Sequence, residues 1–223
     1  MRIFTISIIL LLIIFTPLFA KMQCPECGKI YPDKYKFCED DGTPLEKTTD
    51  IIWRYEVGSN VISSPYVIGE RVYFGSQDYY IYCLNADNSS LIWRYKTGGY
   101  VDSSPYVIEG RIYGGSGDNY IYCLSADSGN LIWRYKTGSW VFSSPFVLGG
   151  RVYIGSSGGY IYCFSSDNGS LFWKYSINIA VESYSFMICG YSWTGKGMYS
   201  SPYVYNGKVY IGSSDGYIYC FSE

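Results

Sequence analysis

Residues 100–138 read YVDSSPYVIEGRIYGGSGDNYIYCLSADSGNLIWRYKTG. This stretch contains four runs of alternating, or β-branched and aromatic, residues: 101–107, 111–115, 120–125 and 131–135. The runs are separated by Glu-Gly, Gly-Asp-Asn and Asp-Ser-Gly-Asn sequences, which favour tight turns between antiparallel strands. The stretch therefore predicts a single sheet of four short strands.

Closely similar stretches precede and follow this one, and their tryptophans recur every forty residues. A fixed period of this length indicates a repeat architecture. A four-stranded unit cannot bury both of its faces alone, and units that stack around an axis form a β-propeller. We therefore predict an all-β fold, a β-propeller of four roughly 40-residue blades. The recurring tryptophans are Trp53, Trp93, Trp133 and Trp173.

The end of each unit carries a recognisable motif: CLNADNSSLIW, CLSADSGNLIW and CFSSDNGSLFW, each preceded by Ser-Ser-Pro and Gly-Ser. The motif resembles the tryptophan-docking motif of PQQ-type, quinoprotein-like propeller repeats, and the resemblance covers residues 51–223. It implies that each Trp packs flat against the neighbouring blade and that a preceding Gly permits the turn. Gly129 and Gly169 match that Gly, whereas Ser89 departs from it.

The phase of the repeats predicts how the propeller closes. The fourth strand of each unit contains the tryptophan, and we call it the Trp strand. Residues 51–58, IIWRYEVG, match a Trp strand but are not preceded by the other three strands of a unit. The last copy, in contrast, supplies the first three strands before Glu223 and no Trp strand. We expect the N-terminal strand to complete the last blade, because closure removes exposed sheet edges. Closure within one chain, exchange of this strand between two chains in an eight-bladed ring, and an open stack of blades remain alternatives.

One cysteine recurs in each blade. Equivalent positions in different blades lie too far apart for a disulfide. We therefore predict that these residues are small buried hydrophobic side chains. They are Cys83, Cys123, Cys163 and Cys220.

Residues 21–50 contain a second pattern, CPECGKIYPDKYKFCEDDGTPLE at 24–46. The spacing of Cys24, Cys27, Cys38 and Asp41, in two C-x-x-C/D-G turns, resembles a zinc ribbon. Four protein ligands imply a structural rather than a catalytic zinc ion. Asp41 stands where a ribbon has a fourth Cys, so Glu39 and Asp40 are alternative ligands. A disulfide or a metal-free turn is the other interpretation.

The first twenty residues, MRIFTISIILLLIIFTPLFA, place one Arg before a 17-residue apolar run that is followed by Ala20. This order predicts a secretory signal peptide over residues 1–20, cleaved after Ala20. An uncleaved membrane anchor is the alternative, because the run is just long enough to span a bilayer. In both cases we expect the rest of the chain outside the cytoplasm, in the periplasm or the extracellular space.

Function is expected where the blades differ. The segments that lead into the innermost strands vary at two equivalent positions, and a 17-residue insertion separates the third blade from the fourth. Such connections cross one face of a propeller, and surface loops commonly carry binding residues. The alternative is that Trp140 and Trp193 merely cap an open axis. The candidate binding face comprises Tyr100, Asp102, Trp140, Phe142 and Trp193.

Composition excludes several function classes. The chain contains no His, which removes Ser-His-Asp and Cys-His catalysis, and its 17 Lys and Arg form no basic stripe for nucleic acid. The PQQ resemblance implies a vicinal Cys pair and acidic calcium ligands in quinone-dependent members, but no two cysteines are adjacent here. We do not expect PQQ to bind. We predict a non-catalytic exported scaffold that binds a protein partner; a quinone-dependent dehydrogenase-like protein or a propeller that binds a carbohydrate or other small ligand is the alternative.

Overall fold

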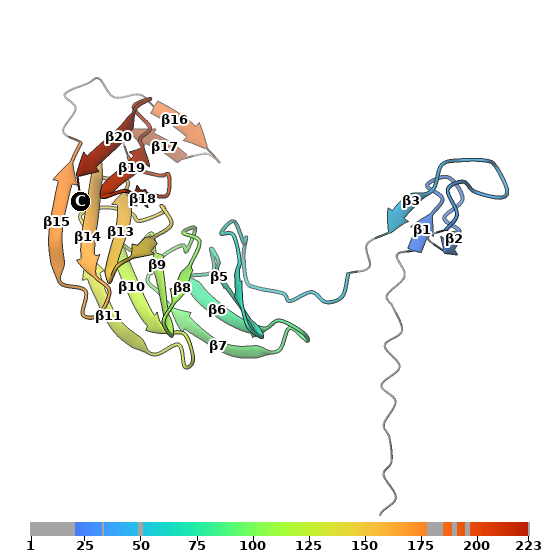
Figure 1. Cartoon of the computed structure of the whole chain (residues 1–223), viewed down its shortest axis with the longest axis horizontal. Coiled ribbons are helices and arrows are strands. Elements are labelled where there is room, and N and C mark those ends of the chain that lie inside the picture. The colour runs from blue at the N-terminus through green and yellow to red at the C-terminus, as the bar shows by residue number, and fades with distance from the viewer. Residues whose placement is uncertain are drawn as a thin grey trace, which may run out of the picture. The chain divides into compact units, whose positions relative to one another are not determined.

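The computed structural model describes residues 21–32, 34–48, 51–177, 185–188, 191–194 and 197–222, in two compact units, Met1–Ile52 and Trp53–Glu223. Every regular element of the described residues is a β-strand, which confirms the predicted all-β class (Figure 1). Within these ranges, no helix has the length and apolar character needed to span a membrane. The predicted signal peptide, residues 1–20, lies outside the described residues.

The first unit is a small sheet in which β1 (Lys21–Gln23) lies between β2 (Ile30–Pro32) and β3 (Glu46–Thr48). Both pairings are antiparallel. Its core consists of Cys24, Tyr31, Cys38 and Leu45. A core this small contributes little hydrophobic stabilisation, so a unit of this size generally needs a disulfide or a metal ion.

The second unit consists of consecutive antiparallel sheets, each with its strands in chain order. The first blade holds β4 (Tyr66–Ile68), β5 (Arg71–Gly75), β6 (Tyr80–Asn85) and β7 (Leu91–Lys96). The second holds β8 (Tyr106–Ile108), β9 (Arg111–Gly115), β10 (Tyr120–Ser125) and β11 (Leu131–Lys136). The third holds β12 (Phe146–Leu148), β13 (Arg151–Ser156), β14 (Tyr160–Ser165) and β15 (Leu171–Ser176).

The fourth blade holds three strands, β18 (Tyr203–Tyr205), β19 (Lys208–Gly212) and β20 (Ile218–Ser222). The insertion before it contains a separate hairpin of β16 (Ser185–Ile188) and β17 (Tyr191–Thr194). The four blades follow one another along an arc, with the Trp strands β7, β11 and β15 on its convex side (Figure 1). The consecutive blades are the repeat units that the sequence predicts.

Trp93 and Trp133 each join their own blade to the next one. Trp93 Nε1 donates a hydrogen bond of 3.0 Å to the carbonyl of Ala126, and Trp133 Nε1 makes the same bond to Ser166. A Cβ atom at Gly129, whose φ is +71°, would lie 2.6 Å from the Trp93 ring. The ring therefore packs directly on the glycine turn of the following blade.

The first and last copies of the motif differ from these two. Ser89, which stands in place of the glycine, adopts the same left-handed conformation, with φ of +57°. Trp53 Nε1 donates to the Ala86 carbonyl at 2.8 Å. Trp173 Nε1 is buried without a hydrogen-bond partner among the described residues. The carbonyl equivalent to that of Ala126 belongs there to Glu223, which lies outside the described residues.

Three of the four blade cysteines are buried as predicted. Cys83, Cys123 and Cys163 are 0% exposed between adjacent blades. Burial raises the pKa of the Cys123 thiol to about 12, so this thiol stays protonated and unreactive. Cys220 is exposed, contrary to the prediction, because no blade covers this face of β20 in the described structure.

The structure differs from the prediction at the closure of the last blade. Residues 51–57 pair with no described strand, and within the described ranges the sheet of β18, β19 and β20 has no fourth strand. Trp53, Tyr55 and Val57 instead pack against the first blade. The physical reason is visible in Figure 1, where the first and fourth blades lie at opposite ends of the arc. A segment docked on the first blade cannot also pair with β20 of the same chain in this geometry.

Candidate functional site

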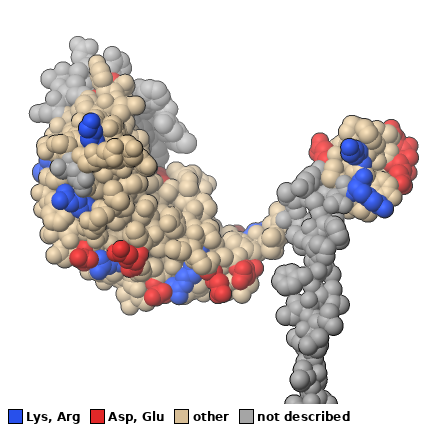
Figure 2. Space-filling model, viewed as in Figure 1, with Lys and Arg blue, Asp and Glu red and all other residues tan. Residues whose placement is uncertain are grey.

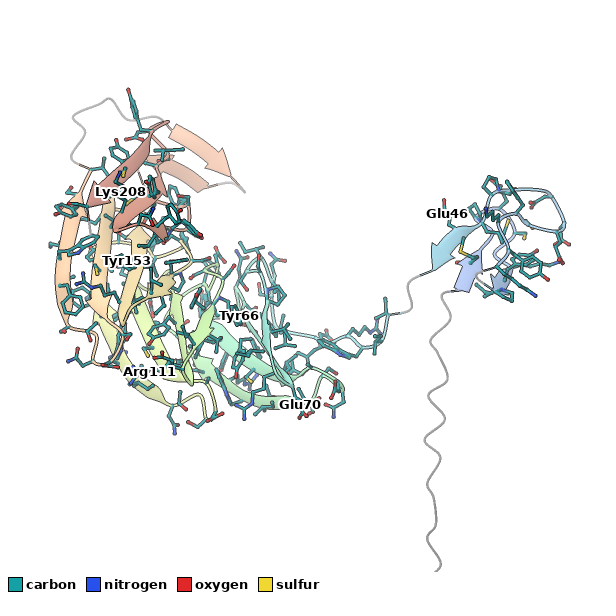
Figure 3. The ribbon with its side chains drawn as sticks, viewed as in Figure 1. Glu46, Tyr66, Glu70, Arg111, Tyr153 and Lys208 are labelled. Carbon is teal, nitrogen blue, oxygen red and sulfur yellow. The ribbon has the colours of Figure 1, made fainter. Side chains whose placement is uncertain are left out.

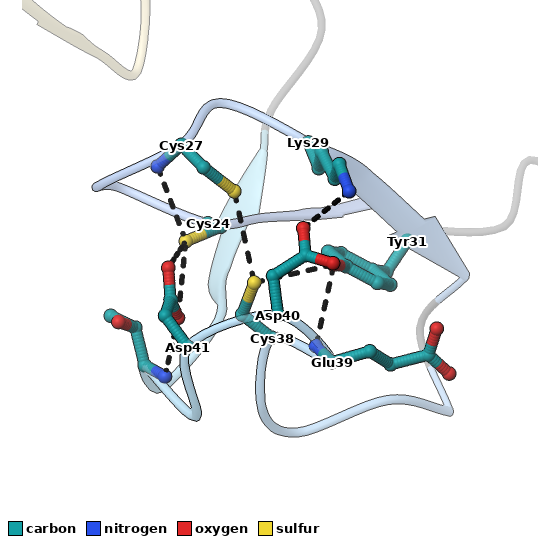
Figure 4. A network of polar contacts seen from close by, with 9 residues as sticks. Cys24, Cys27, Lys29, Tyr31, Cys38, Glu39, Asp40 and Asp41 are labelled. Atoms are coloured by element: carbon teal, nitrogen blue, oxygen red, sulfur yellow. Dashed lines mark hydrogen bonds and ion pairs between the residues drawn. The ribbon is translucent and has the colours of Figure 1, made fainter.

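The cysteines of the first unit lie in two turns of the same shape (Figure 4). The Gly28 N–H donates to the Cys24 carbonyl at 2.9 Å, and the Gly42 N–H donates to the Cys38 carbonyl at 3.0 Å. Both glycines have positive φ, +74° and +72°, which a side chain would strain. The turns are therefore equivalent, and the second places Asp41 where the first has Cys27.

These turns bring the four predicted metal ligands together. The Sγ atoms of Cys27 and Cys38 are 3.7 Å apart, and Cys24 Sγ lies 3.6 Å from Asp41 Oδ2. All four candidate ligand atoms lie within 4.8 Å of one another. Two sulfurs bound to one tetrahedral zinc ion at about 2.3 Å would lie about 3.8 Å apart. The donor set and its spacing therefore fit a four-coordinate zinc ion.

The two neighbouring acidic residues lie outside the cluster. The Asp40 carboxylate forms an ion pair with Lys29, and Glu39 contributes its backbone N–H to the Tyr31 hydroxyl at 3.3 Å. Neither residue belongs to the cluster of potential ligands found in the described residues. Of the three acidic candidates weighed from the sequence, the structure brings Asp41 to the thiols.

Hydrogen bonds favour the charged forms of two of these ligands. The Tyr31 hydroxyl lies 3.3 Å from Cys38 Sγ and lowers the pKa of that thiol. Hydrogen bonds from Thr43, including its N–H at 2.8 Å from Oδ1, hold the pKa of Asp41 below its ordinary value. A thiolate and a carboxylate are the forms that bind a metal ion, so the turns are suited to that role.

The candidate binding face of the propeller lies on the segments that lead into the inner strands. Tyr100 and Trp140 are 40% and 44% exposed. The Trp140 and Phe142 rings lie 5.9 Å apart. Asp102 accepts a hydrogen bond of 3.2 Å from Gln77 Nε2 of the preceding blade, and burial raises its pKa. Trp193 lies in β17 in register with Phe186.

Two neighbours of this face were not among the predicted residues. Tyr79 packs edge-on against Tyr100 at 5.3 Å, and Gln77 binds both Asp102 and Asn60. Both belong to the turn between β5 and β6, which reads Gln-Asp-Tyr in the first blade and Gly-Asp-Asn in the second. This difference between the copies could have identified Gln77 and Tyr79 from the sequence.

Serine side chains connect the inner edges of the blades beside this face. The Ser64 N–H donates to Ser104 Oγ at 2.8 Å, and the Ser104 N–H donates to Ser144 Oγ at 2.9 Å. The second serine of Ser-Ser-Pro therefore makes a contact between blades, whereas the first, such as Ser63 with Gly75, bonds within its own blade.

Comparison with known proteins agrees with this geometry. A family model described as outer membrane protein assembly factor BamB matches residues 45–104 and 80–179. The chain belongs to this family of PQQ-type repeat propellers. No curated protein matches the sequence significantly.

Solved structures show the same fold. BamB from Moraxella catarrhalis has a TM-score of 0.62 and 17% identity, over 77% of this chain and 49% of that one. This chain therefore spans about half the length of that BamB. The computationally designed Ika4 protein has a TM-score of 0.62 and 12% identity, over 78% of this chain and 98% of that one.

A quinohemoprotein alcohol dehydrogenase, ADHIIG from Pseudomonas putida HK5, has a TM-score of 0.59 and 19% identity, over 72% of this chain and 29% of that one. At such low identity these likenesses establish the fold alone.

Proposed function

We propose that this protein is an exported, non-catalytic propeller that binds a protein partner through one rim of its blades. The observation that carries this proposal is a set of exposed aromatic side chains on the loops at that rim, between 37% and 44% exposed. Aromatic residues are enriched in protein interfaces because they offer a large contact area and few rotatable bonds. We call these residues the aromatic rim; they are Tyr79, Tyr100, Trp140 and Tyr199.

The backbone beneath the aromatic rim is held in place before any partner binds. Thr97 Oγ1 donates to the Gly99 carbonyl at 2.8 Å, and Thr137 Oγ1 makes the equivalent bond to Ser139 at 2.6 Å. The Gly98 N–H donates to Asp118 Oδ2 at 2.7 Å. A preorganised surface loses little conformational entropy on binding, which favours affinity.

The distribution of charge supports recognition by shape and apolar contact. In Figure 2, Lys, Arg, Asp and Glu of the propeller unit lie mainly along the outer side of the arc, and other residues form most of the displayed surface. The labelled Arg111 and Glu70 lie at that side in Figure 3, away from Tyr66 and Tyr153.

Two further observations support export and a protein partner. The first twenty residues have the pattern of a signal peptide, and the matching family model is described as an outer membrane assembly factor. We therefore propose that the protein functions in the periplasm or outside the cell. A second copy of the chain is a further candidate partner, with which it would form an eight-bladed ring.

A cross-linking experiment tests the aromatic rim. A photoreactive residue at position 140, in the full chain expressed in its own host, should form a covalent adduct with another protein. Position 132 is the matched control, because Ile132 is 43% exposed on the outer strand β11. Equal labelling from the two positions would contradict the proposal.

The replacement Trp140→Ala should separate binding from stability. Its side chain is 44% exposed, so the free energy of unfolding should change by only about 0.5 kcal/mol. Loss of an aromatic interface residue should weaken binding of the cross-linked partner by about tenfold or more. Titration calorimetry and urea unfolding measure the two effects. An affinity equal to that of the wild type would argue against the rim.

We also infer that Cys24, Cys27, Cys38 and Asp41 hold one structural zinc ion, which would link the two turns of the first unit. The replacement Asp41→Ala should reduce zinc affinity at least about tenfold, whereas Asp41→Cys should retain zinc. Asp40→Asn is the matched control, because Asp40 faces Lys29 instead. Elemental analysis after dialysis measures the bound metal. Equal zinc contents in Asp41→Ala and Asp40→Asn would overturn the ligand assignment.

The protein should retain zinc at neutral pH and release it at acidic pH. The thiols and the carboxylate bind the ion in their deprotonated forms, so acidification supplies competing protons and should release zinc, while a return to neutral pH should restore binding. A chromogenic chelator follows the release. A zinc content unchanged between neutral and strongly acidic pH would contradict a thiolate site.

A further inference from the structure

The two ends of the blade stack carry complementary halves of an interface that the chain already forms three times. We call the face of a blade that points toward the next blade in the chain its leading face, and the opposite face its trailing face. On the leading face of each of the first three blades, the next blade covers an isoleucine. These residues, Ile81, Ile121 and Ile161, are 2%, 0% and 0% exposed. The equivalent residue of the fourth blade, Ile218, is 80% exposed. The leading face of the fourth blade therefore presents apolar side chains that every other blade buries.

The trailing face of the first blade shows the reciprocal feature. Val107, Val147 and Val204 are 4%, 5% and 4% exposed because each packs under the preceding blade. Val67, their equivalent in the first blade, is 60% exposed. The trailing face of the first blade is thus the surface that fits onto a leading face.

Residues 51–57 supply the remaining part of this interface. In the first three blades the recurring cysteine lies directly opposite the tryptophan in the strand register, as Cys83 does with Trp93. Trp53 already makes the packing contact of such a strand with the first blade, but residues 51–57 pair with no described strand. The same register would place Trp53 opposite the exposed Cys220 of a β20 strand.

Aromatic rings on the inner strands also make the same contact from each blade to the next. Tyr66 packs on Tyr106 at 5.9 Å, Tyr106 on Phe146 at 6.0 Å, and Phe146 on Tyr203 at 5.2 Å. Tyr203 at the end of this row is 59% exposed. The first ring of another row could therefore continue it by the same contact.

We propose that the occupant of these ends is a second copy of this chain, joined head to tail, with residues 51–57 of each copy completing the last blade of the other. Because the first and fourth blades of one chain lie at opposite ends of the arc (Figure 1), one copy does not fill its own gap. Two identical head-to-tail contacts related by a twofold axis close a ring. This interface is separate from the aromatic rim.

Charged replacements on the two faces test the proposal. Ile218→Asp or Val67→Asp should leave a single chain folded, because both side chains are exposed there, and should weaken dimer formation by at least about a hundredfold, because the dimer would bury the carboxylate. Ile132→Asp is the control, since Ile92 and Ile132 are exposed in both of their blades, at 41% and 43%. Sedimentation equilibrium measures association, and circular dichroism confirms folding. A wild-type chain that is monomeric throughout, or folded variants that dimerise like the control, would overturn the proposal.

Engineered cysteines distinguish a second copy from closure within one chain. The register of Tyr80 with Lys96 places Tyr217 opposite Glu56 in the completed blade. The double replacement Glu56→Cys and Tyr217→Cys should therefore form a disulfide between chains, mapped by peptide mass and seen as a covalent dimer under non-reducing conditions. A disulfide between these positions within one chain, or none at all, would overturn the proposal.

Discussion

The replacement Trp133→Ala should lower the free energy of unfolding by about 3 to 5 kcal/mol, the range for deleting a buried large aromatic side chain. Trp133 is 8% exposed and belongs to the core cluster between the second and third blades. The replacement removes its ring contact with Tyr113 at 5.9 Å and leaves the Ser166 carbonyl without its indole donor. Trp93→Ala should have an effect of the same size, because Trp93 makes the same contacts one blade earlier.

Urea unfolding of the full chain measures this effect, and Ile132→Ala is the matched control. Ile132 neighbours Trp133 on the same strand but points outward, with 43% of its side chain exposed. We expect its unfolding midpoint to stay near that of the wild type. If the Trp133→Ala and Ile132→Ala midpoints coincide, the tryptophan does not hold the blades together.

The replacement Gly115→Ala should also be severe, with a loss of about 3 kcal/mol or more from overpacking. A Cβ atom at Gly115 would lie 2.3 Å from Val141 Cγ1 and 2.4 Å from the Val141 carbonyl oxygen. The second contact is with backbone, so no side-chain rotation relieves it. The added methyl group should therefore force the second and third blades apart.

Gly138→Ala provides the control for this prediction, because no atom lies within 4 Å of a Cβ at Gly138. Thermal unfolding should separate the two variants clearly, with Gly138→Ala close to the wild type. A Gly115→Ala protein as stable as Gly138→Ala would show that adjacent blades approach less closely than the structure has them.

The blades were predictable from the sequence because their determinants are local and repeated. The forty-residue spacing of Trp93 and Trp133 sets the unit, and turn sequences such as Asp-Ser-Gly-Asn separate its strands. The arc was not predictable, because the angle between blades depends on packing at each interface, including the contact of Gly115 with Val141. The phase of the repeats predicts that residues 51–57 complete the last blade, whereas in the structure they pack against the first blade.

The candidate sites also contain some features that local sequence determines and others that depend on packing between blades. The cluster of Cys24, Cys27, Cys38 and Asp41 could be read from spacing because each pair of ligands belongs to one short turn. The hydrogen bond from Gln77 to Asp102 joins two blades, so its geometry emerges only when the blades are stacked. Tyr79 was missed for the same reason, because its contact with Tyr100 also crosses from one blade to the next.

We have proposed that the propeller unit is a half ring that a second copy completes and that the first unit binds one zinc ion. Native mass spectrometry of the full-length protein, purified without chelators, examines both proposals together, because a single spectrum counts the chains and the bound metal ions. We predict a particle of two chains with two zinc ions. A particle of one chain, even at high concentration, would contradict the ring, and a two-chain particle without bound metal would contradict the zinc site.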